Sequence, residues 1–134
     1  GRGPNTSFSG GAGLLSTAND YARFLQMTLN GGELDGQRVL SRKTIELMTT
    51  DHLGGIPFRD GQGFGLGFFV VTDLGERGIL GSEGEYGWGG AYHTTYWVDP
   101  TEELVVVYLT QLIPAQGIDD YSKLRSGIYQ AFID

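Results

Sequence analysis

The stretch YGWGGAYHTTYWV (residues 86–98) decides the fold, because it joins a glycine-rich segment to a run typical of a β-strand. Glycine fills three of the six positions in residues 86–91. Glycine has no Cβ, so another group can approach this backbone closely. Residues 92–98 are aromatic and β-branched, which predicts a strand. We interpret residues 86–91 as one wall of an active site.

Two further runs have strand character. Residues 104–109 (LVVVYL) are apolar without alternation, which predicts a central strand covered on both faces. Residues 64–72 predict another strand, although Gly65 and Gly67 weaken its strand propensity. The connections between the three runs are short, with a turn at Pro100, so we expect an antiparallel sheet.

Helices are predicted on both sides of these strands. Thr17 to Asp20 resembles a capping box, and the positions that follow have one apolar face: Tyr21, Phe24, Leu25, Thr28 and Leu29. An Asp35-Gly36 turn follows, and Ser41 can cap a second helix that ends at about residue 50.

Near the C-terminus, apolar residues recur at helical spacing after Asp119 or Asp120 as the cap: Tyr121, Leu124, Ile128 and Phe132. The fold class predicted for residues 1–134 is therefore a single α+β domain. It contains an antiparallel sheet of at least three strands, with N-terminal and C-terminal helices packed on it.

The charge and residue content of the chain exclude several classes of function. The net charge of −7 comes without a cluster of Lys or Arg, so we expect no nucleic-acid partner. The absence of cysteine excludes a thiol nucleophile and a thiolate metal site. The two histidines and the acidic residues have no metal-ligand spacing, so no metal or cofactor is expected. No apolar run reaches the roughly 18 to 20 residues of a membrane span. The sequence leaves the compartment open between bacterial periplasm and cytoplasm.

Taken together, several segments resemble the C-terminal part of the serine β-lactamase-like hydrolases. That family includes class C β-lactamases, D-alanyl-D-alanine carboxypeptidases and related carboxylesterases. The matching segments occur in the family's order: GGAGLLSTANDYARFLQMTLNGGELDGQRVLS, GFGLGFFV, YGWGGAYHTTYWVDP and LVVVYLTQ. The resemblance covers nearly the whole chain and implies the C-terminal portion of the β-lactamase/transpeptidase-like fold.

In this family an active-site strand carries K-T-G or a variant, and Trp88-Gly89-Gly90 resembles the Trp variant. The resemblance implies that the Ala91 N–H is one of two oxyanion-hole donors. It also implies that Tyr86, Trp88, Gly89 and Gly90 bind a small-molecule ester, amide or β-lactam. Because Trp88 is uncharged where many relatives place Lys, we expect small esters or hydrophobic acyl groups rather than efficient β-lactam hydrolysis.

Two elements that the family's chemistry needs are missing from this sequence. No serine is followed at the fourth place by lysine, as S-x-x-K requires, and no Tyr begins Y-x-N or Y-x-S. We therefore expect the chain to be the C-terminal fragment of a longer enzyme and to be inactive alone. Its partner would be the missing N-terminal portion of the same protein.

Other interpretations stay open. The chain could be a non-catalytic module that binds a ligand or peptide, or mediates assembly, through residues 88–97. Exposed edges of an isolated piece would favour self-association. Trp88 could simply cap the core, and His93 is interpreted as a hydrogen-bonded residue inside a strand rather than a general base. Glu83 and Glu85 are expected to be solvated charges rather than a glycosidase pair.

Overall fold

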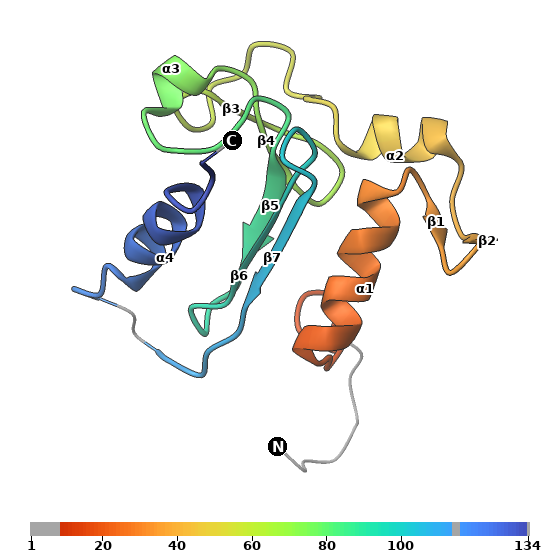
Figure 1. Ribbon diagram of the computed structural model, residues 1–134, viewed down its shortest axis with the longest axis horizontal. Coiled ribbons are helices and arrows are strands. Elements are labelled where there is room, and N and C mark those ends of the chain that lie inside the picture. The colour runs from red at the N-terminus through yellow and green to blue at the C-terminus, as the bar shows by residue number, and fades with distance from the viewer. Residues whose placement is uncertain (1–8, 114–115, 134) are drawn as a thin grey trace.

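The computed structural model describes residues 9–113 and 116–133, and it contains a five-stranded antiparallel sheet (Figure 1). The strand order β3-β4-β5-β6-β7 follows the chain. The strands are β3 (Gln62–Phe64), β4 (Phe69–Val71), β5 (Tyr86–Gly89), β6 (Thr95–Asp99) and β7 (Leu104–Tyr108). The α+β class and the antiparallel sheet are confirmed.

Helices α1 (Ala18–Leu29) and α4 (Asp120–Tyr129) cover opposite faces of this sheet (Figure 1). On the α1 face, Leu25 is completely buried in one apolar cluster. The other buried residues of that cluster are Val70, Tyr86 and Val98 from the sheet and Phe68, which directly precedes β4. On the α4 face, Trp97 is completely buried beside Tyr121, Leu124 and Ile128. The sheet therefore has the cover on both faces that its apolar strands require.

The first two predicted helix starts are confirmed, whereas at the third the Asp119 side chain, at the N-cap of α4, makes no capping hydrogen bond. The Thr17 hydroxyl accepts a hydrogen bond from the Asp20 amide at 3.1 Å, and α1 begins at the next residue, Ala18. Likewise the Ser41 hydroxyl caps α2 (Arg42–Met48). Between these helices a hairpin of β1 (Glu33–Leu34) and β2 (Gln37–Arg38) turns at Asp35-Gly36, where both residues have positive φ.

The strand predictions need three corrections. Residues 64–72 do not form one strand, because β3 and β4 pair antiparallel and Gly67, at φ +92°, lies in the turn between them. Residues 92–94 belong to the turn between β5 and β6, so β6 begins only at Thr95. Strand β7 lies at the edge of the sheet that the described residues form, and not at its centre.

A short helix, α3 (Leu74–Arg77), was not expected from the sequence; Asp73 caps it through its carboxylate and the Glu76 amide. Within residues 9–113 and 116–133, no helix is long and apolar enough to cross a bilayer.

Candidate active site

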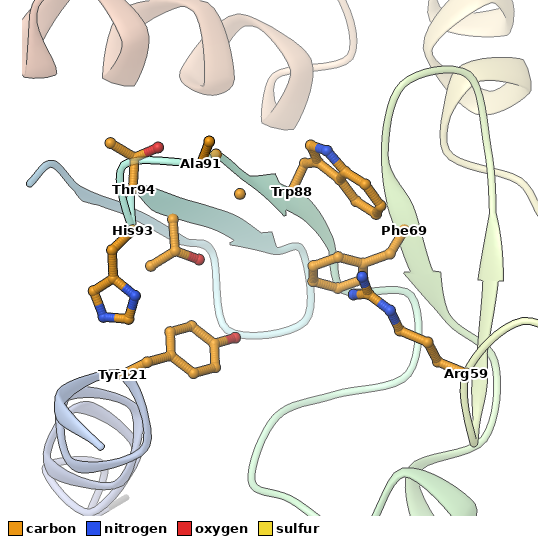
Figure 2. A pocket seen from close by; sticks show the side chains of 10 residues that line it. Arg59, Phe69, Trp88, Ala91, His93, Thr94 and Tyr121 are labelled. Carbon is orange, nitrogen blue, oxygen red and sulfur yellow. The ribbon is translucent and has the colours of Figure 1, made fainter. Parts of the chain in front are cut away.

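The C-terminal end of β5 and the turn after it form one wall of a cavity of about 560 Å³ (Figure 2). The other walls come from the loop before β3, from β4 and β6, and from the start of α4. The lining residues are Arg59, Phe69, Trp88, Gly89, Gly90, Ala91, His93, Thr94, Thr95 and Tyr121. Four residues expected from the sequence, Trp88, Gly89, Gly90 and Ala91, are therefore brought together.

Tyr86 is not part of this wall. Its side chain is buried in the α1-side core, and its hydroxyl lies 2.7 Å from the Thr28 hydroxyl. Burial raises the pKa of the Tyr86 phenol. The expectation that Tyr86 binds substrate is corrected here, because a phenol enclosed in the core cannot reach a molecule in the cavity.

Among the described residues, the turn between β5 and β6 leaves the amides of Ala91, Tyr92 and Thr94 without a hydrogen-bond acceptor, and Ala91 is the one of these three on the expected wall. The Gly90 N–H donates to the Thr94 carbonyl at 2.9 Å, and the His93 N–H donates to the Gly90 carbonyl at 3.1 Å. The Ala91 N–H donates to no group of the described chain, and Ala91 is exposed in the cavity wall. An exposed, fixed amide of this kind can donate to an oxyanion.

The glycines of this wall have a structural use. A Cβ at Gly87 would lie 2.2 Å from the Tyr96 carbonyl oxygen, and one at Gly90 would lie 2.4 Å from the Thr94 hydroxyl. At Gly87 the neighbour is backbone, so a side chain is excluded, whereas at Gly90 a side chain would require the Thr94 hydroxyl to move. The close approach expected from the sequence is therefore made at these two positions by β6 and its turn.

Trp88, which lines the cavity, also belongs to an aromatic cluster with Phe58 and Phe64. Its ring stacks on Phe58, with centroids 6.4 Å apart, and meets Phe64 edge-on at 5.2 Å. The Arg59 guanidinium carbon lies 5.1 Å from the centroid of the Trp88 ring. Sequence reasoning missed Arg59 as a lining residue and Phe58 as a neighbour of Trp88, because the loop before β3 has no periodicity that predicts where it packs. It missed the contact of Phe64 with Trp88 because residues 64–72 were interpreted as one strand.

His93 lies in the turn, with φ +67°, and not inside a strand. Its Nε2 is 2.7 Å from Asp120 Oδ1, while the Tyr108 hydroxyl donates to Asp120 Oδ2 at 2.6 Å. The Tyr108 hydrogen bond, and then that of His93, hold the pKa of the Asp120 carboxyl below its usual range. His93 is thus hydrogen-bonded as expected, but it fastens the turn to α4.

The two glutamates before β5 have different environments. Glu83 is exposed, as expected. Glu85 is completely buried and pairs with Arg77 at 2.9 Å and with Arg125 at 2.6 Å, so its interpretation as a solvated charge was wrong. The described residues contain no group of three or more His, Cys, Asp or Glu that could hold a metal ion.

Comparison with known proteins gives a consistent result. A family model described as Beta-lactamase matches residues 1–123. Protein Rv1367c of Mycobacterium tuberculosis is 41% identical over 128 residues, which cover 87% of this chain and 32% of that protein. A protein of Escherichia coli O157:H7 named "Putative D-alanyl-D-alanine carboxypeptidase" is 32% identical over 105 residues, which cover 76% of this chain and 23% of that protein.

Among solved structures, the fold matches "EstCE1, a hydrolase with promiscuous acyltransferase activity". The TM-score is 0.75 at 27% identity, over 90% of this chain and 32% of that chain. This chain thus spans about a third or less of the length of these relatives. The resemblance expected from the sequence segments is confirmed, and the chain belongs to the Beta-lactamase family.

Proposed function

We propose that this chain is the C-terminal portion of a serine hydrolase. The complete protein would acylate its own serine with an ester, amide or β-lactam and then hydrolyse the acyl-enzyme. The observation that carries the proposal is the exposed Ala91 N–H, without an acceptor among the described residues, in a cavity wall beside Trp88. The names of the relatives, a hydrolase and a carboxypeptidase, support acyl transfer as the reaction class.

In this proposal the chain contributes binding and electrostatics rather than the nucleophile. The serine Oγ would bond to the carbonyl carbon, and the Ala91 N–H would stabilise the negative charge that develops on the carbonyl oxygen. The leaving group departs with a proton, and water then releases the acid and restores the serine hydroxyl. The nucleophile and its base would come from the N-terminal portion, because no S-x-x-K occurs here.

Two assays test the proposal. With a chromogenic cephalosporin and short p-nitrophenyl esters, this chain alone should not exceed the buffer blank, whereas the chain joined to the upstream sequence of its gene should turn over at least one of these substrates. Turnover by this chain that a serine-directed inhibitor abolishes would contradict the proposal.

The donor role of Ala91 is tested in the active, longer protein. Ala91→Pro removes the N–H and should lower kcat by about 10²- to 10³-fold, whereas Ala91→Gly keeps the N–H and should retain most of the activity. Equal losses in the two variants would assign the effect to packing instead of hydrogen bonding.

A non-catalytic binding or assembly module is the second candidate. A formed cavity in a chain without S-x-x-K favours it. The upstream sequence discriminates the two: S-x-x-K followed by Y-x-N or Y-x-S favours the enzyme, and the absence of both favours the module. The β7 edge also suggests that this chain self-associates. A sedimentation coefficient independent of concentration would count against self-association.

A further inference from the structure

Arg59 differs from the other cations of the described chain. Every other lysine and arginine within residues 9–113 and 116–133 forms an ion pair: Arg23, Arg38, Arg42, Lys43, Arg77, Lys123 and Arg125. Arg59 forms none with the carboxylates of this part of the chain, although the protein carries a net charge of −7.

The structure nevertheless fixes Arg59 at one place. Its carbonyl accepts the Gln62 N–H at 3.0 Å, in a tight turn that Gly61 completes with φ +68°. Its guanidinium carbon lies 4.9 Å from the Phe58 centroid and 5.1 Å from the Trp88 centroid. Contact with two aromatic rings attracts the cation without neutralising its charge.

The charge of Arg59 faces the candidate active site. Its side chain lines the same cavity as Trp88 and Ala91 (Figure 2). Among the residues that the structure describes, no aspartate or glutamate lines this cavity, and His93, the other basic residue in its wall, already has Asp120 as a partner. The wall therefore combines an unneutralised cation with aromatic surface, which suits an anion attached to an apolar group.

We propose that Arg59 binds a carboxylate of the substrate, and so determines specificity at this site. A guanidinium presents a planar fork of N–H donors that matches the two oxygens of a carboxylate. The Trp88 motif supplies no cation itself, so the charge comes from a different segment, the loop before β3. The role as a substrate site rests on the proposed hydrolase function, but binding of the anion does not.

Binding is measured on this chain by ¹H–¹⁵N NMR with two probes of similar shape, phenylacetate and phenylacetamide. Phenylacetate should bind about 5- to 10-fold more tightly, and its binding should weaken with added salt because Arg59 is exposed. It should shift the Trp88 indole and Ala91 amide signals. Equal affinity for the two probes, or no shift of these signals with either, would overturn the proposal.

Two substitutions of Arg59 test whether this residue causes the preference for phenylacetate. Arg59→Gln should remove the preference for phenylacetate over phenylacetamide, while Arg59→Lys should keep part of it. Arg38→Gln is the control, since Arg38 lies in the β1–β2 hairpin and pairs with Glu33. A preference that survives Arg59→Gln, or that Arg38→Gln removes equally, would contradict a role for Arg59.

Kinetic assays of the longer protein distinguish the anion site at Arg59 from the proposed hydrolase activity. The longer protein is assayed with p-nitrophenyl valerate, which is neutral, and the p-nitrophenyl monoester of glutarate, which carries a carboxylate. Arg59→Gln should lower kcat/KM about 10-fold for the anionic ester alone. If neither ester is hydrolysed while NMR shows the Arg59-dependent preference, the hydrolase proposal fails and the anion site stands. Equal effects on the two esters would overturn the substrate role of Arg59.

Discussion

The Nε2 of His93 lies 2.7 Å from Oδ1 of Asp120, the first residue of α4, and this contact ties the turn between β5 and β6 to the helix. The same turn is also held by the segment after β7, where the Leu112 N–H donates a hydrogen bond to the Tyr92 carbonyl at 3.2 Å. His93 has φ +67°, a conformation that residues other than glycine rarely adopt. The turn that presents the Ala91 amide is thus held from outside, against a local conformational cost.

Replacing His93 should separate the hydrogen bond from the backbone conformation. His93→Ala and His93→Gly both lose the contact with Asp120, but only glycine adopts a positive φ without strain. We expect both variants to lower the free energy of unfolding, the alanine variant by about 1 kcal/mol more. Urea denaturation measures this difference. Equal stabilities would show that the turn relaxes when the histidine is removed.

Asp120 should contribute to a fall in the thermal stability of the protein at acidic pH. Hydrogen bonds from Tyr108 and His93 lower its pKa in the folded state, so its contribution is present above the ordinary carboxyl pKa of about 3.9. That contribution is lost as pH falls through the lower pKa of the folded state. Asp120→Asn should therefore flatten the decline of Tm below about pH 4. Parallel Tm curves for the two proteins would contradict this.

The parts of the fold that could be predicted are those governed by neighbours in the sequence. Thr17 and Ser41 cap the amides three residues ahead of them, and the Asp35-Gly36 turn needs only its own two residues. Trp88 to Ala91 were singled out because they form one short motif, and these residues line the cavity. Such features do not depend on where the remainder of the chain packs.

The features that could not be predicted depend on partners distant in sequence. Glu85 looks like a surface residue in a Gly-rich loop until Arg125, forty positions later, reaches it from α4. Likewise, nothing near Arg59 shows that its guanidinium lies over Trp88. The split of residues 64–72 into two strands was missed because Gly67 was interpreted as a weak strand position instead of a turn.

Glu85→Gln should be strongly destabilising, because it leaves the buried Arg77 and Arg125 side chains without their common counter-charge. Removing one partner from a buried ion pair typically costs about 3–5 kcal/mol. Glu83→Gln, two positions earlier and exposed, is the control and should change stability by less than about 0.5 kcal/mol. Chemical denaturation of both variants provides the comparison. Similar effects at the two positions would show that Glu85 is not the centre of this cluster.

Gly87 and Gly127 provide a test of how tightly β5 fits the sheet. A Cβ at Gly87 would meet β6 backbone atoms, 2.2 Å from the Tyr96 oxygen and 2.8 Å from the Trp97 Cα, whereas a Cβ at Gly127 in α4 meets nothing within 4 Å. We expect Gly87→Ala to cost about 3 kcal/mol, and Gly127→Ala to gain up to about 1 kcal/mol from helix propensity.

The Ala91 amide signal in an NMR spectrum should move with Gly87→Ala, because β5 leads directly into the turn that carries it. It should stay unchanged with Gly127→Ala, because Gly127 lies about two helical turns from Asp120, the α4 residue that contacts the turn, and a Cβ there meets no other group. If Gly87→Ala is tolerated without such a shift, the strand has room to move away from β6. The Ala91 amide would then not be held in place by the pairing of β5 with β6, and its use as a fixed oxyanion donor would lose its structural support.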